Sequence, residues 1–415
     1  MTMLRNHLTL AWRVLWRRPF FTATSLFGIS FTLVVLMVAV ALLDHIFAPM
    51  APEVRQDRTL GIFRAQFIGP HSQWNSAAGY RLLDRYARNL PGVERLGIVS
   101  VPAEVHSYTG GQRIESFLRR ADADYWRILD FDFLEGGPFT DQDVAGGSAV
   151  AVISAATRER FFGSAPAVGR SITADGQSFR VIGVVTDVPA TRPVASGDIY
   201  VPLTTAKTDA YRQELLGDFF GLLLARSSSE FPAIKAELES RLKSVEMPDR
   251  EYDRFVAPAE TYFESVARQS FGRREETRGH PERLWAAIAA AGLLFLLLPT
   301  VNLVNLNVSR IMERASEIGV RKSFGASSWT LVGQFVVENV CLTLVGGLIG
   351  FVFSSIILYA ISAAEVIPYA HLRLNLRVFL YGVGLSVLFG LLSGVYPAWR
   401  MSRLHPVAAL RGAAR

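Results

Sequence analysis

Four long runs of apolar residues constrain the fold of this chain more than any other feature of its sequence. An α-helix needs roughly 20 apolar residues to cross about 30 Å of hydrocarbon at about 1.5 Å per residue. One such run could be the core helix of a soluble protein, but four in 415 residues favour a membrane protein. The predicted spans are 20–43, 284–308, 329–364 and 378–399.

The first run has an alternative interpretation as a cleaved signal peptide, because four arginines precede it. The apolar part of a signal peptide typically has about 7–15 residues, whereas the run at 20–43 is much longer. We therefore expect a retained first span, preceded by a cytoplasmic amphipathic segment at 1–19.

The distribution of basic residues predicts the orientation. The segments 1–19, 309–328 and 400–415 each contain four Arg or Lys residues, whereas 365–377 contains two. Because Arg and Lys are enriched in short cytoplasmic segments, both termini and the loop at 309–328 are predicted to be cytoplasmic. Residues 44–283 and the short loop at 365–377 are then predicted to lie outside. The net charge of +6 fits the anionic inner leaflet of a membrane better than nucleic acid.

The predicted fold class is a membrane protein with four transmembrane α-helices and a large mixed α/β domain inserted between the first and second. Residues 44–283 alternate between strand-like and helix-like patterns, which is typical of such a domain. Asp175-Gly176 predicts the turn of a hairpin over 171–188, and we expect an inserted subdomain at about 120–212. The other predicted strands lie at 59–67, 149–153 and 219–225, and the helices at 77–89, 155–162 and 232–245.

The sequence has no recognisable pattern for catalysis or metal binding. No lysine follows a glycine, which excludes a Gly-Lys-Ser/Thr phosphate loop, and neither G-x-S-x-G nor H-E-x-x-H occurs. The single cysteine, Cys341, excludes an internal disulfide. Asp122, Asp124, Asp130 and Asp132 are interpreted as the solvated face of a short amphipathic helix rather than as an ion site. We therefore expect no catalytic residue, no cofactor and no metal in this chain.

Three motifs resemble one known family. Residues 313–326 read ERASEIGVRKSFGA, residues 396–411 read YPAWRMSRLHPVAALR, and residues 179–189 read FRVIGVVTDVP. The first two resemble the FtsX-like, MacB-type permeases of ABC transporters, and the third resembles the periplasmic core domain of that family. The motifs also occur in the family's order and fit its one-plus-three arrangement of spans.

The resemblance implies a permease of the inner membrane that pairs with a second copy or with a related paralogue. It also implies a separate cytoplasmic ATPase, which binds the ATP, and allows for a periplasmic adaptor. ATP-driven closure would be relayed to the periplasmic domain, by mechanotransmission, to export or extract a hydrophobic compound, peptide or lipoprotein. Two alternatives stay open. One is a signal relay that regulates an external partner such as a cell-wall hydrolase, and the other is an anchored external binding protein without an ATPase.

The loop at 309–328 is the expected ATPase-coupling site. Glu317 and Arg321 are four residues apart in the order that stabilises a helix, and Gly325 is expected to end that helix. The alternative is a re-entry turn whose charges hold it at the lipid headgroups. The expected coupling residues are Glu313, Glu317, Ile318, Gly319, Arg321, Lys322 and Gly325.

Small and amide side chains are expected to pack the helices. Glycines four residues apart occur in the third and fourth spans, and this spacing lets helices approach closely in lipid. Two asparagines near the end of the second span are expected to form interhelical hydrogen bonds, and Glu338 is expected to be structural. The packing residues are Gly346, Gly350, Gly390, Gly394, Asn302 and Asn305.

Overall fold

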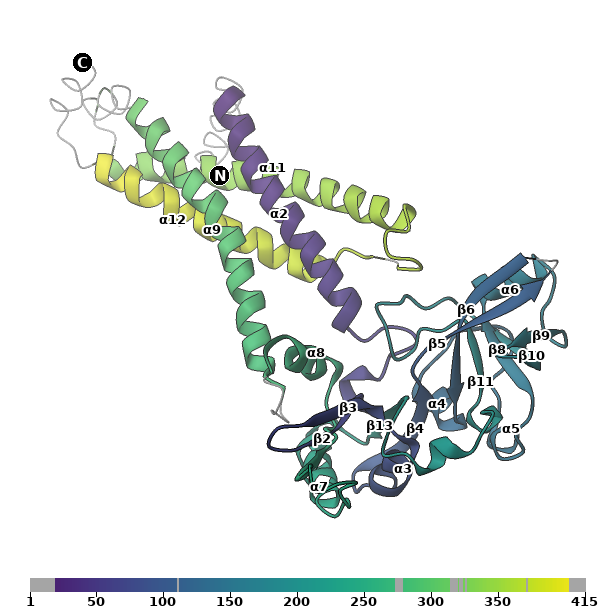
Figure 1. Cartoon of the computed structure of the whole chain (residues 1–415). Coiled ribbons are helices and arrows are strands. Elements are labelled where there is room, and N and C mark those ends of the chain that lie inside the picture. Colours follow the sequence, from purple (N-terminus) through teal and green to yellow (C-terminus); the bar gives the residue numbers. More distant parts are fainter. Residues whose placement is uncertain are drawn as a thin grey trace. The chain divides into compact units, whose positions relative to one another are not determined.

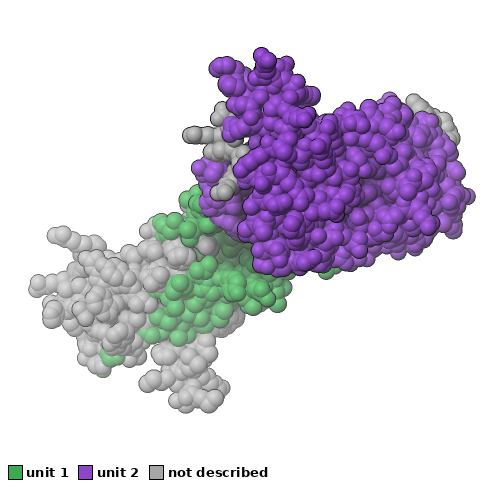
Figure 2. All heavy atoms as spheres, turned by 90° about the horizontal axis from the view of Figure 1, so that it is seen from below, with its two compact units in different colours: residues 1–45, 286–366, 371–415 green, residues 46–285, 367–370 purple. Residues whose placement is uncertain are grey.

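The computed structural model describes residues 19–109, 112–272, 279–313, 320, 324, 327–370 and 372–402. The chain divides into two compact units, and each is described by itself (Figure 2). The helical unit comprises Met1–His45, Ala286–Val366 and His371–Arg415, and the α/β unit comprises Ile46–Trp285 and Ile367–Ala370.

Long helices form the described part of the helical unit (Figure 1). They are α2 (Pro19–Phe47), α9 (Pro281–Glu313), α11 (Ser328–Ala363) and α12 (Leu376–Ser402), of which α2 and α9 continue into the α/β unit. Within the described residues, two stretches are long and apolar enough to cross a membrane. They are Thr22–Phe47, with a mean hydropathy of 2.8, and Val336–Ala363, with 2.3. The count of four spans and the limits of each segment stay predictions.

Apolar side chains of α2 pack against α11 inside the helical unit. Ile29 and Leu33 form a buried cluster with Leu342. A second cluster, farther along α2, joins Ala41 to Leu358. Because these side chains recur at helical spacing, one face of α2 is buried along its length whereas other faces are open.

The α/β unit is built on a mixed sheet in which fourteen strands are described. Along the sheet the order is β14-β2-β3-β13-β4-β6-β11-β8-β10-β7, with β1 beside β13, β12 beside β3, β5 beside β6 and β9 beside β10. The pairs β10–β8 and β11–β6 are parallel. The strands are β1 (Thr59–Ile62), β2 (Ala65–Ile68), β3 (Gln73–Ala78), β4 (Val93–Ser100), β5 (Ala103–Thr109), β6 (Gln112–Ala121), β7 (Phe133–Gly136), β8 (Val150–Ser154), β9 (Ser171–Ala174), β10 (Gln177–Val185), β11 (Ile199–Pro202), β12 (Leu216–Gly217), β13 (Phe219–Ala225) and β14 (Arg254–Val256).

Short helices connect these strands (Figure 1). The α-helices are α3 (Tyr80–Leu82), α4 (Ala123–Ile128), α5 (Asp141–Ala145), α6 (Ala155–Phe162), α7 (Phe231–Leu242) and α8 (Tyr262–Phe271). Single tight turns are η1 (Gln56–Arg58), η3 (Leu203–Thr205), η4 (Ala210–Gln213) and η5 (Ser228–Glu230), and η2 (Leu83–Ala87) is a wider, π-helical turn.

The sheet has two halves that meet where Val99 of β4 lies opposite Ala121 of β6. The half from β14 to β4 encloses one apolar core, which includes the fully buried Leu83. The half from β6 to β7 encloses another, which includes Phe179. A third cluster, which includes Tyr125 of α4, contains residues from both halves. The α/β unit therefore has a substantial apolar interior formed by its own residues.

Several local predictions are confirmed in this unit. The hairpin turns where predicted, because Ala174 pairs with Gln177 and the two residues between them, Asp175 and Gly176, have φ of 51° and 72°. Two-residue hairpin turns of this type need left-handed backbone at both positions. Helix α6 has the predicted limits and begins after Ser154, whose hydroxyl accepts a hydrogen bond from the helix backbone. Strands β8 and β13 and helix α7 also lie where the sequence predicts them.

Two local predictions are wrong. The stretch 59–67 is not one strand, because β1 pairs with β13 whereas β2 pairs with β14 and β3. The stretch 77–89 is not one helix, because Ala77 and Ala78 pair with β12 and α3 begins at Tyr80. In both places, pairing with strands distant in the sequence overrides the local pattern.

Candidate coupling and packing sites

The expected coupling loop lies between α9 and α11. Glu313 is the last residue of α9, and α11 begins at Ser328. Two apolar residues of the loop are described, and both are exposed: Val320 at 48% and Phe324 at 87%. The expected coupling residues Glu317, Ile318, Gly319, Arg321, Lys322 and Gly325 lie outside the described residues. Their role in coupling therefore stays a prediction.

The glycines of the third span lie where α11 meets α2. A Cβ atom added to Gly346 would lie 2.9 Å from Cγ2 of Ile29. One added to Gly350 would lie 3.1 Å from Cβ of Leu33 and 3.3 Å from the carbonyl oxygen of Ser30. Both glycines therefore permit a close approach of helices within one chain. The surroundings of Gly390, Gly394, Asn302 and Asn305 lie outside the described residues.

A polar contact that the sequence did not reveal holds the start of α12. Asn375 donates from Nδ2 to Oδ2 of Asp44 at 2.7 Å, and its Oδ1 accepts from the backbone N of Val378 at 3.2 Å. An asparagine before an apolar run is a signal for a helix N-cap. The partner Asp44 is 331 residues away in the sequence, and no local pattern indicates it.

Within α11, Glu338 is buried and accepts a hydrogen bond from Gln334 at 3.0 Å.

Aromatic rings join the two chain segments that enter and leave the α/β unit. Phe47, the last residue of α2, contacts Phe263 of α8 with ring centroids 5.1 Å apart, and Tyr262 at 5.9 Å. Phe263 in turn contacts Trp285, near the start of α9, at 4.9 Å. We call these four residues the aromatic junction. Such ring contacts add roughly 0.5–1.5 kcal/mol each beyond the burial of apolar area.

A buried ion pair fixes the segment that follows α2. Arg192 is 1% exposed, and its Nη1 donates to Oε2 of Glu53 at 2.8 Å. Its Nη2 donates to the carbonyl oxygen of Ala48 at 2.8 Å. Burial raises the pKa of the Glu53 carboxyl, and the neighbouring guanidinium of Arg192 opposes that rise. The pair thus ties the beginning of the unit to the loop that precedes β11.

The same loop is held from its other side by three fully buried side chains. Arg119 of β6 donates to the carbonyl oxygens of Pro193 and Val194. The hydroxyl of Tyr125 donates to the carbonyl oxygen of Val194 at 3.2 Å, and that of Tyr200 donates to the carbonyl oxygen of Ala195 at 2.6 Å. Burial lowers the pKa of Arg119 and raises that of Tyr125. Because buried backbone carbonyls need donors, these side chains fix the path of the loop.

Helix α8 is attached to β1 by a second buried ion pair. Arg268 donates to both carboxylate oxygens of Glu260, at 2.6 and 3.0 Å, and both side chains are buried. The backbone of Glu260 also exchanges two hydrogen bonds with Gly61 of β1. Thr261 and Glu264 form a capping box at the start of the helix. The helix that carries part of the aromatic junction is therefore firmly placed in the unit.

The acidic cluster is only in part the solvated helix face that the sequence predicts, because α4 ends at Ile128 and does not include Asp130 and Asp132. Asp122 caps α4 by accepting a hydrogen bond from the backbone N of Tyr125 at 2.9 Å, and burial raises its pKa to about 7. Asp124 pairs with Arg95 at 2.8 Å and with Arg127 at 3.0 Å. These contacts satisfy two of the carboxylates without an ion, so the cluster is a helix cap and a charged surface.

Among the described residues, one group of side chains has ligand atoms close enough for a metal. Glu104, His106 and Glu115 lie on the β5–β6 hairpin, are exposed, and have ligand atoms within 4.8 Å of one another. Arg113 lies within 2.9 Å of His106 Nε2 and 3.2 Å of Glu115. Because a guanidinium already occupies the position of a cation, this group is a surface charge cluster.

Two family descriptions match the chain. Residues 22–241 match the MacB-like periplasmic core domain, and residues 289–406 match the FtsX-like permease C-terminal region. The chain is 28% identical over 418 residues to the pyoverdine export ATP-binding/permease protein PvdT of Pseudomonas fluorescens, covering 96% of this chain and 58% of PvdT. The chain thus spans 58% of the length of this relative.

Another relative is similar along most of its length. The uncharacterized ABC transporter permease YknZ of Bacillus subtilis is 24% identical over 341 residues, covering 81% of each protein. The crystal structure of the periplasmic region of MacB from Actinobacillus actinomycetemcomitans is similar at 14% identity and a TM-score of 0.37, covering 54% of this chain and 97% of that one. From the two family matches, the chain belongs to the FtsX-like, MacB-type permeases of ABC transporters, with a periplasmic domain of mixed α/β structure.

Proposed function

We propose that the chain is a permease subunit that couples ATP hydrolysis by a separate cytoplasmic ATPase to movement of its periplasmic domain. In this proposal it crosses the inner membrane four times with both termini in the cytoplasm. It pairs with a second permease, whether identical or related, and has no catalytic residue, metal or cofactor of its own. The ATP is bound by the partner. Residues 309–328 contact the ATPase, as the family motif at 313–326 implies.

The observation that carries this proposal is the set of contacts that hold the ends of α2 and α9 that belong to the α/β unit. The aromatic junction joins Phe47 at the end of α2 to Trp285 at the start of α9 through α8. Arg192 ties the segment after α2 to the loop before β11. Packed side chains and hydrogen-bond networks can transmit a displacement because they are not continuously deformable. In this proposal, a displacement that reaches these packed ends is passed on to the domain.

The expected activity is export or extraction of a hydrophobic compound, peptide or lipoprotein. Export is the activity in the printed name of PvdT, which supports transport over a signal relay without cargo. The relay remains the alternative, and a transport assay separates the two. Recruitment of an ATPase would contradict the third possibility, an anchored binding protein that works alone.

The test of coupling reverses two charges in the cytoplasmic loop. Glu317→Lys together with Arg321→Glu keeps the net charge and leaves the hydrocarbon-spanning residues unchanged. Truncating or reversing one member of a desolvated charge pair costs about 2–5 kcal/mol, enough to weaken association more than about tenfold. We expect normal expression but loss of ATPase recruitment and of permease-dependent ATPase stimulation. The measurements are a pull-down and an ATPase assay in nanodiscs.

A matched control exchanges the same charges elsewhere. Glu239 and Lys243 are exposed and also four residues apart, in and just after α7. Glu239→Lys together with Lys243→Glu should leave recruitment and stimulation unchanged. Parental binding and stimulation by the loop variant would show that the loop is a membrane turn and would refute the coupling assignment.

A further inference from the structure

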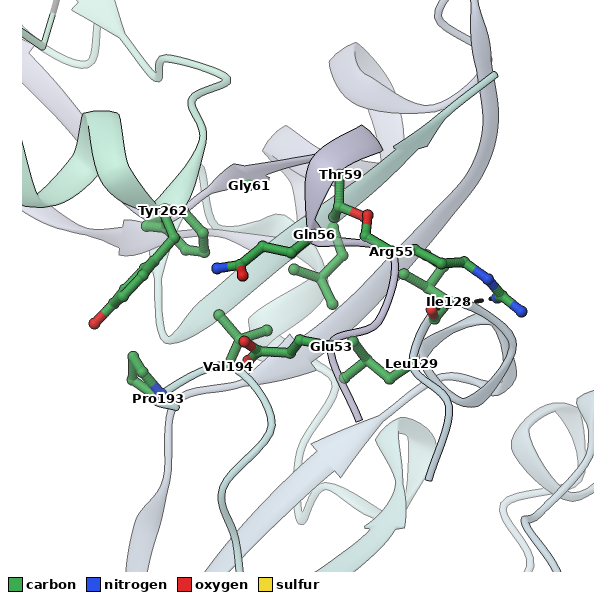
Figure 3. Close-up of a pocket in the computed structure, with 12 residues that line it drawn as sticks. Glu53, Arg55, Gln56, Thr59, Gly61, Ile128, Leu129, Pro193, Val194 and Tyr262 are labelled. Carbon is green, nitrogen blue, oxygen red and sulfur yellow. Dashed lines mark hydrogen bonds between the residues drawn. The ribbon is translucent and has the colours of Figure 1, made fainter. Parts of the chain in front are cut away.

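A pocket in the periplasmic domain lies beside the buried ion pair of Glu53 and includes Tyr262 of the aromatic junction. It lies where the segment after α2, strands β1 and β13, the end of α4, the loop before β11 and helix α8 meet (Figure 3). The space around it, much of it open to solvent, is about 470 Å³. Small-molecule sites are mostly apolar and have a few polar groups. The enclosed part of the pocket fits a small polar group, and the rest of a ligand would lie along the open mouth.

Two hydrogen-bond acceptors without partners lie in this pocket. Glu53 is 9% exposed, and while its Oε2 accepts from Arg192, its buried Oε1 has no partner among the described residues. The buried Oε1 of Gln56 also has none among them. Figure 3 shows the polar ends of both side chains directed toward the side of the pocket where Tyr262 and Pro193 lie. Buried polar atoms are paired in most proteins, so these two acceptors point to a missing donor.

The charges around Glu53 exclude most charged ligands. The guanidinium groups of Arg192 and Arg119 are both buried and interact with this carboxylate. Two buried cations against one anion leave an excess positive charge, which disfavours an organic cation. The buried free atoms of Glu53 and Gln56 are both oxygens, and the carboxylate oxygen in particular disfavours an anion. An uncharged group that donates a hydrogen bond, such as a hydroxyl, satisfies both conditions.

Most of the remaining wall of the pocket is apolar, although Arg55 and Thr59 also line it. The apolar part matches a hydrocarbon body attached to such a hydroxyl, because apolar surface is buried favourably. We propose that the pocket binds an uncharged amphiphile through a hydroxyl group at Glu53 and Gln56. This site goes beyond the proposed coupling function and does not depend on it. The apolar wall consists of Phe63, Ile128, Leu129, Val194, Leu222 and Tyr262.

The experiment uses photoreactive probes on the full chain in nanodiscs. The probes are octanol, octylamine and octanoate, each with a diazirine on the same hydrocarbon chain. After irradiation, adducts are mapped by mass spectrometry, and labelling of α11 measures the amount of each probe in the bilayer. We expect the alcohol to label peptides that contain Glu53 or Tyr262 about fivefold more than the amine or the carboxylate does. This ratio corresponds to the free energy of about one to two hydrogen bonds. Unlabelled 1-octanol should compete.

Two substitutions at Gln56 keep the buried ion pair intact. Gln56→Leu removes one acceptor and should lower pocket labelling by the alcohol about threefold or more. Gln56→Trp should occupy the space and abolish that labelling. The control Gln142→Leu, at an exposed position in α5, should change nothing. Equal labelling by the three probes, absence of competition, or labelling unaffected at Gln56 would refute a site that selects a hydroxyl group. No ATPase is needed, so such a failure would leave the proposed coupling untouched.

Discussion

Replacing Arg192 with leucine removes the cation from a buried ion pair. Arg192 is 1% exposed, and its loss strands the carboxylate of Glu53 and leaves the carbonyl oxygen of Ala48 without this donor. Removing one partner of a buried pair costs about 3–5 kcal/mol. Since domains are stable by only about 5–15 kcal/mol, Arg192→Leu should destabilise the periplasmic domain severely.

The stability lost in Arg192→Leu should increase as the pH rises. Burial already raises the pKa of Glu53, and removing Arg192 takes away the main influence that opposes the rise. The carboxyl of the folded variant then keeps its proton at pH values where the unfolded chain has released it. Between the two pKa values the folded form binds more protons, so stability falls as pH rises. The destabilisation should therefore be larger at about pH 8 than at about pH 5.

The assay is urea unfolding of the isolated periplasmic domain, followed by tryptophan fluorescence. We expect this domain to fold alone, because its apolar cores consist of its own residues. The double variant Arg192→Leu with Glu53→Leu should recover most of the lost stability, since apolar replacement of a whole buried pair is often neutral. A loss below about 1 kcal/mol for Arg192→Leu at high pH, or no recovery in the double variant, would refute the reasoning.

Three further predictions concern topology, packing and titration. In a cysteine-free background, a cysteine at Ser228 should react with an impermeant thiol reagent in outer-membrane-permeabilised cells, whereas one at Ser316 should not; labelling at Ser316 would overturn the orientation. Gly350→Leu should reduce the thermal stability of the detergent-solubilised chain, because the new side chain meets Leu33. The control Gly384→Leu should leave that stability unchanged, since a Cβ there meets no atom within 4 Å among the described residues. Burial raises the pKa of Asp122 to about 7, so its protonated form stabilises the fold at low pH and this contribution is lost as pH rises through about 7. Asp122→Asn keeps a helix cap and should flatten the pH dependence of urea unfolding; an unchanged slope would contradict this.

Sequence patterns predicted those features that depend on composition and on neighbours along the chain. The long apolar runs predicted long helices, and the structure has helices over all four. The turn at Asp175-Gly176 was predictable because it depends on two consecutive residues with left-handed backbone. The family was recognisable from the motif at 313–326, although the structure does not describe most of that loop.

Features that depend on partners distant in the sequence follow only from the packing of the folded chain. β1 and β2 are separate strands because they pair with different neighbours, which the apolar pattern of 59–67 does not show. Arg192 and Glu53 are 139 residues apart, and no spacing rule connects them. The pocket beside Glu53 exists because six segments of the chain meet there. Local patterns record which residues favour burial, but the fold alone determines which buried side chains face one another.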